Sequence, residues 1–288
     1  MSAPKTPNRP TSQLRDDRFR LLEDLAKELT EEIVFPISFA VSLRISQVMS
    51  SDRSSMDQIV AEVQKDPLVA SKLVQICNSA LYSTSGQAVS ELSHALGRVG
   101  LTTVRSVAMS CAMAQLAKAK ESAVFAEQLT SLHVHSVKTA VIARLLAREF
   151  TRINPETAML AGLVHDMGAF YIYSRVIHYP ELVERPDTVA YLVAQWHESI
   201  GSVLLDALGL PQEVIDAATE VDVPRRALST PRTLNDIVYL ANLFAGGFDE
   251  MERLDLPDLM RPEDLDNPRF TVLQEKMDTL CAEALASW

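Results

Sequence analysis

The sequence is poor in glycine and in aromatic residues. It contains 9 glycines in 288 residues, and Phe, Trp and Tyr make up 6% of the chain. Sandwiches and barrels depend on glycine-containing turns and on strands rich in β-branched and aromatic residues. No stretch alternates apolar and polar residues over the length of a strand, and only Phe170 to Tyr173 has a strand-like composition. The abundant Ala, Leu, Val, Ser, Glu and Asp favour helices instead.

Cysteine is also scarce, and no long hydrophobic run occurs. Cys77, Cys111 and Cys281 are odd in number, widely spaced and each set in an apolar helical pattern. Buried, reduced thiols in a reducing cytoplasm are therefore expected. No apolar run approaches the roughly 20 residues of a membrane span, and residues 1–10 lack the apolar segment of a secretory signal.

Positive charge is too sparse for a general nucleic-acid-binding protein. The formal net charge is −11, whereas binding to phosphates needs a surplus of Lys and Arg. The first 20 residues are an exception, because Lys5, Arg9, Arg15, Arg18 and Arg20 make them locally basic. This segment is expected to be a solvated tail.

Start signals for helices recur along the chain. They combine a capping Ser, Thr, Asp or Asn with a proline or with a second polar residue three positions later. The predicted starts are Ser55 with Gln58, Asp66-Pro67, Asn154-Pro155, Thr233 with Asp236, and Asn267-Pro268. Apolar periodicity adds a helix from about residue 133 to 150 and a stripe over residues 189–204.

The predicted fold is an all-α multi-helix bundle. Residues 1–30 form a tail and a helix, residues 31–246 form the helical domain, and residues 247–288 form an acidic linker (249–266) and a final helix. The helix that starts at Asn154 is predicted to stop at Gly168, since glycine commonly ends helices.

The strongest candidate site is His165-Asp166, in Ala161-Gly-Leu-Val-His-Asp-Met-Gly168. Adjacent imidazole and carboxylate groups at a helix end can chelate a metal such as Zn, Mn or Fe. A buried His that is hydrogen-bonded to a carboxylate is the alternative. His135, on an earlier helix, is a further ligand candidate.

A hydrolytic site of this kind would use a later Asp, and the natural segment, residues 237–244, offers Asn242. His135, His165, Asp166 and Asn242 would then supply one carboxylate, two imidazoles and a neutral amide. We expect this set to hold a cation weakly. His197 lies at the edge of an apolar stripe, which favours a packing role.

A second candidate site is the basic stripe of Arg144, Arg148 and Arg152. It could meet an anion, a nucleotide or an acidic partner helix, although a solvated helix face is the simpler interpretation. The phosphate-binding motifs GxxxxGK(S/T) and GxGxxG and the nucleophile motif GxSxG are absent.

Several segments together resemble the HDOD family over about residues 30–245. They are Asp66-Pro67 followed by Asn78-Ser79-Ala80, then His94-Ala95-Leu96-Gly97, Ala161–Gly168, and His197-Glu198-Ser199-Ile200-Gly201 running to Gly209-Leu210-Pro211. The resemblance implies a helical core related to HD hydrolases and a role in bacterial signalling. It also marks departures from active HD-GYP enzymes: Asn242, Ala169 in place of Lys, and no later paired His or GYP sequence.

Three functions remain open from the sequence. The leading hypothesis is a non-catalytic, cytoplasmic regulatory module that binds a protein partner and has no cofactor. The alternatives are a metal-dependent phosphohydrolase that uses His135, His165 and Asp166, and a cyclic-dinucleotide sensor that uses the arginine stripe.

Independently of the function, Asn78 is expected to set a turn through hydrogen bonds from its side chain to the backbone.

Overall fold

The computed structural model describes residues 12–31, 33, 35–49, 54–83, 88–223, 225–248 and 260–288, with side chains from Arg18 onward. Within these segments the chain is helical and contains no strand, which confirms the predicted fold class. Residues 1–11 of the expected tail and residues 249–259 of the expected linker lie outside the described residues. Residues 12–20, which were expected to belong to the tail, are helical.

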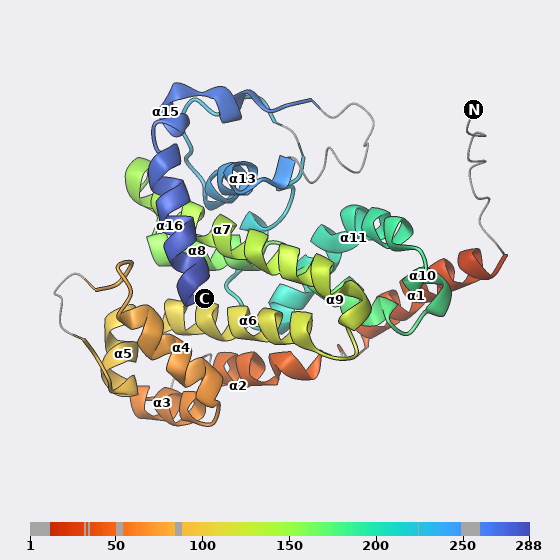
Figure 1. The fold of residues 1–288 in the computed structure, drawn as a ribbon, viewed down its shortest axis with the longest axis horizontal. Helices are drawn as coiled ribbons and strands as arrows, with labels where there is room; N and C mark the ends of the chain where they lie inside the picture. Colours follow the sequence, from red (N-terminus) through yellow and green to blue (C-terminus); the bar gives the residue numbers. More distant parts are fainter. Residues whose placement is uncertain are drawn as a thin grey trace.

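Over the described segments, α-helices and three short 3₁₀ helices follow one another (Figure 1). The first half contains α1 (Ser12–Thr30), η1 (Ile37–Phe39), α2 (Ala40–Met49), α3 (Met56–Gln64), α4 (Pro67–Cys77), α5 (Leu92–Val99), α6 (Leu101–Lys118), η2 (Ala123–Phe125) and α7 (Ala126–Phe150). The second half contains α8 (Pro155–Val164), α9 (Met167–Val176), α10 (Pro180–Val183), α11 (Pro186–Ala207), α12 (Gln212–Ala217), α13 (Leu234–Ala245), η3 (Glu263–Asp266), α15 (Pro268–Thr271) and α16 (Gln274–Ser287).

The predicted helix starts are confirmed. Ser55 and Gln58 form a reciprocal capping box before α3, and the Asp66 carboxylate accepts from the first backbone N–H groups of α4. Asn154 caps α8, and Thr233 forms a second capping box before α13. These bonds satisfy backbone donors that the helix itself leaves without a partner.

Helix α7 is the centre of the bundle (Figure 1). It packs against α6, α8, α13 and α16. Helices α3, α4 and α5 form a smaller group at one end of α6 (Figure 1), and they share with α2 and α6 a hydrophobic cluster that includes Ile59, Leu73 and Leu96.

The C-terminal residues belong to the bundle core. Phe270, Met277 and Cys281 share a hydrophobic cluster with residues of α7 and α13. Lys72 of α4 donates to the carbonyl oxygen of Ser287 at 3.1 Å. Helix α16 thus joins the α3–α5 group to α7, as Figure 1 shows.

The predicted stop at Gly168 is wrong. Helix α8 ends at Val164, and Gly168 lies inside the next helix, α9, which also contains the strand-like run Phe170 to Tyr173. A Cβ on Gly168 would lie 1.9 Å from the carbonyl oxygen of His197. Gly168 is therefore required for the close crossing of α9 and α11, a tertiary demand that local sequence does not reveal.

Two other helix boundaries differ from expectation. Helix α7 begins at Ala126, about two turns before the predicted start near His133, and the final helix is divided into α15 and α16.

Asn78 sets its turn as expected. Its Nδ2 donates to the carbonyl oxygens of Val74 and Val89, and its Oδ1 accepts from Val89 N at 2.7 Å.

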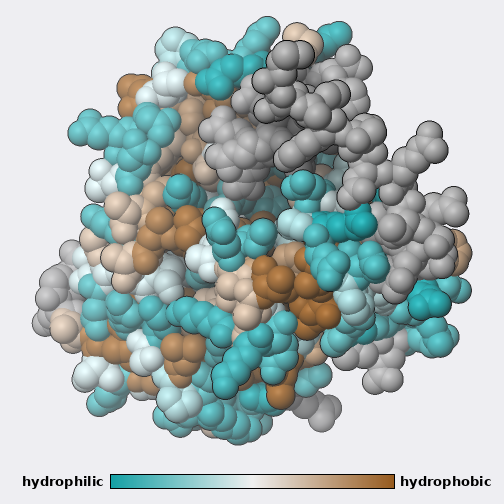
Figure 2. Space-filling view, turned by 45° about the vertical axis from the view of Figure 1, so that its right-hand side comes forward, coloured by the Kyte–Doolittle hydropathy of each residue, from teal (hydrophilic) through white to brown (hydrophobic). Residues whose placement is uncertain are grey.

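The three cysteines are buried and unpaired, as expected. In the described part of the chain, no helix is both long and apolar enough to cross a membrane. On the face shown in Figure 2, apolar side chains form small separate patches among hydrophilic ones.

Candidate metal centre

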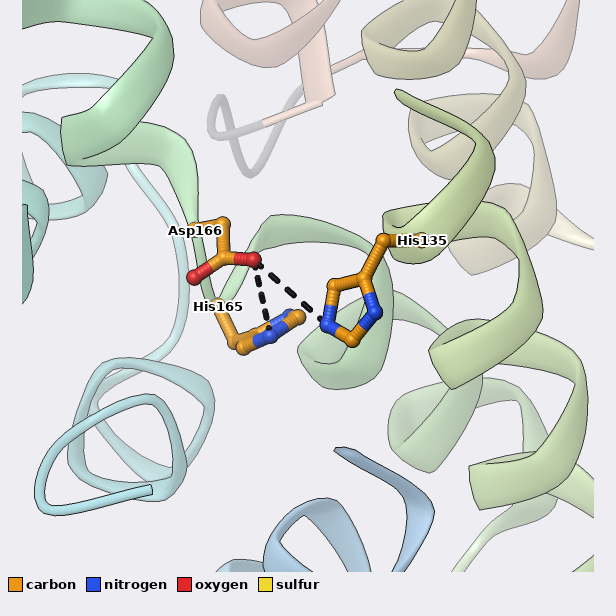
Figure 3. Close-up of side chains that lie close together, drawn as sticks. All are labelled: His135, His165 and Asp166. Carbon is orange, nitrogen blue, oxygen red and sulfur yellow. Dashed lines mark ion pairs between the residues drawn. The ribbon is translucent and has the colours of Figure 1, made fainter. Parts of the chain in front are cut away.

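Three predicted site residues meet where α7, α8 and α9 converge. His135 lies in α7, His165 directly follows α8, and Asp166 directly precedes α9. The Oδ2 atom of Asp166 lies 3.1 Å from His165 Nε2 and 3.7 Å from His135 Nε2. Figure 3 shows Asp166 above the two imidazole rings, whose centroids are 5.3 Å apart.

The Asp166 carboxylate is not used to cap its own helix, since it accepts no backbone hydrogen bond there. Its position at the N-terminus of α9 places the negative charge where the helix dipole favours it. The side chain is 10% exposed and faces imidazoles with both oxygens, because Oδ1 lies 3.7 Å from His197 Nε2. Asp166 is therefore suited to bridge two groups of ligands.

Two of the histidines are held in the orientation that metal-binding histidines adopt. Nδ1 of His165 lies 2.8 Å from the Gly162 carbonyl oxygen, and Nδ1 of His197 lies 2.9 Å from that of Val193. A carbonyl oxygen can only accept, so each Nδ1 carries the proton and donates it. Each Nε2 is then directed at the carboxylates, because the hydrogen bond from Nδ1 to the backbone fixes the tautomer, as it does for histidines that bind a metal.

His197 and Asp222 also belong to the cluster, which corrects the expected count of one carboxylate and two imidazoles. His197 is buried in α11, and its Nε2 lies 2.9 Å from Asp222 Oδ2. The cluster contains two overlapping sets whose ligand atoms lie within 4.8 Å of one another: His135, His165 and Asp166, and Asp166, His197 and Asp222. The packing role predicted for His197 is incomplete, because its ring also faces this cluster.

The loop that carries Asp222 is clamped to α11. The carboxylate of Glu198 accepts from the backbone N–H groups of Glu220, Val221 and Asp222, with N–O distances of 3.0, 2.7 and 3.3 Å. Glu220 adopts a positive φ of 55°, which is strained for a residue with a side chain. The loop conformation is thus fixed by Glu198, which directly follows His197.

Asn242 lies in the cavity, as the sequence predicts, and its amide nitrogen contacts a carboxylate. It is 1% exposed, and its Nδ2 donates to Asp222 Oδ1 at 2.8 Å. The amide group therefore holds a carboxylate from another part of the chain.

A cavity of about 530 Å³ opens beside the cluster. Its polar lining includes His135, Asp166, His197, Asp222 and Asn242, and Leu132, Tyr173 and Val193 contribute apolar surface. His165 lies behind it, 2% exposed. Among the described residues that line the cavity there is no Lys or Arg, whereas Asp166, Glu198 and Asp222 are acidic.

Burial and charge pairing act in opposite directions on the titration of the cluster. Burial alone would lower the pKa of His197, but Asp222 outweighs it and raises the pKa to about 10. Burial would raise the pKa of Asp166, but the His165 imidazole outweighs it and holds that pKa below its ordinary value. The carboxylates thus favour the protonated form of His165 and His197 in the metal-free protein, and a cation would compete with those protons.

A buried nitrogen without a hydrogen bond also fits a metal ligand set. His165 Nε2 is buried and has no hydrogen-bond partner among the described residues, whereas His135 faces Asp166 with Nε2. For His165 the unbonded nitrogen is the one that faces Asp166. Imidazole and carboxylate together are suitable ligands for Zn, Mn or Fe, so the residues present fit a divalent metal.

The arginine stripe does not take part in this site. Arg144 Nε donates to Glu156 Oε1 at 2.8 Å, and its guanidinium lies 4.9 Å from the centre of the Tyr82 ring. Arg148 and Arg152 are exposed on the surface, and none of the three lines the cavity.

Comparisons with known proteins agree with the helical fold. The HDOD domain family model matches residues 35–224. No curated protein was matched by sequence. A "putative metal-dependent phosphohydrolase" from Shewanella amazonensis SB2B superposes with a TM-score of 0.66 at 23% identity, covering 93% of this chain and 99% of its own.

Two further solved structures share the fold at lower similarity. An HDOD domain protein with unknown function from Geobacter sulfurreducens gives a TM-score of 0.52 at 20% identity, with 94% of this chain and 90% of that chain covered. A "putative signal transduction protein" from Marinobacter aquaeolei VT8 gives 0.54 at 18% identity, with 96% and 66% covered.

Proposed function

The chain belongs to the HDOD family, and from this premise we propose that it is a bacterial signal-transduction module that binds a divalent cation in its His/Asp cavity and acts through a protein partner without hydrolysing a substrate. The name of the Marinobacter relative supports a signalling role. The buried, unpaired cysteines support a reducing, cytoplasmic setting.

One observation carries the proposal: the cavity combines metal-ligating side chains with an acidic lining. Phosphoryl transfer relies on metal ions together with Lys or Arg groups that stabilise the phosphoryl oxygens. The described lining offers no Lys or Arg for this role, and before a metal binds, the carboxylates of Asp166, Glu198 and Asp222 disfavour an anion. Ala169, which faces the cavity, supplies no ammonium group. The cavity thus favours a cation over a phosphate ester.

A metal-dependent phosphohydrolase is the second candidate. The shared position of Asp166 between two ligand sets favours it, because hydrolases of phosphate esters commonly use paired metal ions. The name of the Shewanella relative agrees with this activity. A cyclic-dinucleotide sensor has less support, since Arg144 is already paired with Glu156.

The test combines metal analysis with an activity assay. Protein purified without chelator is loaded with Mn²⁺, freed of excess metal, and assayed with bis(p-nitrophenyl) phosphate and a cyclic dinucleotide. We expect bound Mn²⁺ and no turnover above that of Asp166→Asn, with Asp206→Asn, an exposed carboxylate on α11, as the matched control. Metal-dependent turnover that disappears in Asp166→Asn would show that the chain is an enzyme, and a wild type without metal would refute cation binding.

A further inference from the structure

We propose that the cavity binds a second divalent cation between Asp166, His197 and Asp222, and that Asp222 supplies the carboxylate that position 242 lacks. This inference rests on the proposed cation-binding function and specifies its ligands. It assigns the role of ligand to Asp222 and the role of positioning residues to Asn242 and Glu198.

The geometry of the second ligand set supports this. Asp222 Oδ2 lies 2.9 Å from His197 Nε2, and His197 Nε2 lies 3.7 Å from Asp166 Oδ1. The first set uses the other oxygen of Asp166, because Oδ2 is the atom nearest to His135 and His165. One carboxylate can therefore serve both sets, with one oxygen directed to each.

The histidine of the second set is prepared for a ligand. The Val193 carbonyl accepts the Nδ1 proton of His197 and leaves Nε2 directed at two carboxylates. On the opposite side of Asp166, the buried His165 Nε2 has no hydrogen-bond partner among the described residues. These two nitrogens lie on either side of the Asp166 carboxylate, as two separate cations would require.

Asp222 is held in place from two directions. Asn242 donates to Oδ1, which leaves Oδ2 for His197 and a cation. Glu198 binds the backbone of residues 220–222 through three hydrogen bonds and stabilises the strained Glu220. Strained backbone persists only where the surroundings enforce it, and such positions are common at ligand sites.

A structural ion pair between His197 and Asp222 is the competing explanation. An ion pair would contribute the same stability with or without divalent metal. A cation site, in contrast, predicts that Asp222 matters mainly when metal is present, because a ligand that binds only the folded state raises its stability. The metal-induced change in melting temperature therefore separates the two explanations.

The experiment counts cations in Mn²⁺-loaded wild type, Asp222→Asn and the control Asp206→Asn, and measures each melting temperature with Mn²⁺ and with chelator. We expect two cations per chain in wild type and in Asp206→Asn, and one in Asp222→Asn. We also expect a smaller metal-induced rise in melting temperature for Asp222→Asn. In Mn²⁺ electron paramagnetic resonance, the coupling between two ions should appear in wild type and be absent in Asp222→Asn.

Each of the other possible outcomes would refute a specific part of the proposal. Two cations, or an undiminished metal-induced rise, in Asp222→Asn would refute the role of Asp222. One cation in both wild type and Asp222→Asn would refute the second site and leave the proposed cation binding intact. No cation in wild type would refute both. If Asp222→Asn does not fold, His197→Gln is judged by the same criteria.

Discussion

The side-chain amide of Asn242 donates a hydrogen bond to Asp222, with Nδ2 2.8 Å from Oδ1. The two residues come from different elements, since Asn242 lies in α13 and Asp222 in the loop after α12. A neutral residue at one corner of the cavity thus fixes a charged residue that arrives from another part of the chain. The charge of the ligand set can be judged only when both residues are considered.

Asn242→Asp should destabilise the metal-free protein and increase its response to metal. The substitution replaces the donor with a carboxylate beside Asp222, so a hydrogen bond is lost and two like charges meet in a buried place. We expect the free energy of unfolding in chelator to fall by about 1–3 kcal/mol. Urea unfolding with and without Mn²⁺ measures both effects.

Asn154→Asp is the control for Asn242→Asp, because Asn154 caps α8 and Asp is an equally good capping residue. It should leave the metal response unchanged. An Asn242→Asp variant that is more stable than wild type in chelator would contradict the role assigned to the amide.

Glu198→Gln should weaken metal binding without changing the number of ions at saturation. The carboxylate accepts three backbone N–H groups of the Asp222 loop, whereas a carboxamide offers one oxygen and turns a donor toward the others. Loss of such outer-shell support typically costs about 10- to 100-fold in metal affinity. Calorimetric titration with Mn²⁺ tests this, with the exposed Glu213→Gln as control, and equal affinities for Glu198→Gln and wild type would exclude the clamp.

Gly168→Ala and Gly97→Ala should have opposite effects on stability. A Cβ at Gly168 would meet the His197 carbonyl oxygen at 1.9 Å, whereas a Cβ at Gly97 would meet nothing within 4 Å. We expect Gly168→Ala to lose about 2 kcal/mol or more because α9 and α11 must separate. Gly97→Ala, within α5, should gain about 0.5–1 kcal/mol. Urea unfolding measures the free energy of unfolding of both variants. Similar free energies for the two would contradict the close crossing of α9 and α11.

The stabilising effect of Glu62 should disappear in acid. Lys65 and Arg44 hold the pKa of Glu62 below its ordinary value, with Arg44 Nε 2.8 Å from Oε1. A carboxyl group whose pKa is lower in the folded state stabilises the protein above its unfolded pKa and loses this effect as the pH falls through the folded pKa. Glu62→Gln should therefore be less stable than wild type at pH 7, by up to about 1 kcal/mol, and nearly equal to it near pH 3. A difference that stays constant in melting curves between these pH values would argue against the shift.

Much of the fold could be predicted because helix starts are encoded locally. Ser55, Asp66, Asn154 and Thr233 bind the backbone within three residues of themselves, so the sequence contains both partners. The sequence predicts a stop at Gly168 wrongly, because a glycine that ends a helix and a glycine that permits two helices to cross have the same sequence signal. The difference lies in the position of His197.

The site was predicted only where its residues are neighbours or carry a recognisable pattern. His165 and Asp166 are adjacent, and His135 is the early histidine that a hydrolytic site of this kind and the HDOD resemblance both call for. His197 was assigned to packing because it belongs to the apolar stripe of α11, and Asp222 lies in a loop whose path depends on Glu198 and Asn242.

The pair Gly168 and Gly201 is a sequence signal that could have identified His197 as a site residue. Each follows a site histidine closely, and a Cβ on Gly201 would lie 3.3 Å from Gly168 N. Such a contact between two glycines brings the backbones of α9 and α11 together, and with them Asp166 and His197.

Calorimetric titration of metal-free protein with Mn²⁺, for wild type and Asp166→Asn, tests the central claim most directly. Asp166 is common to both ligand sets, so the account predicts saturable binding in wild type and loss of that binding in Asp166→Asn. Wild-type protein that binds no Mn²⁺, or an Asp166→Asn variant that binds it as wild type does, would contradict the claim that this cavity is a cation site.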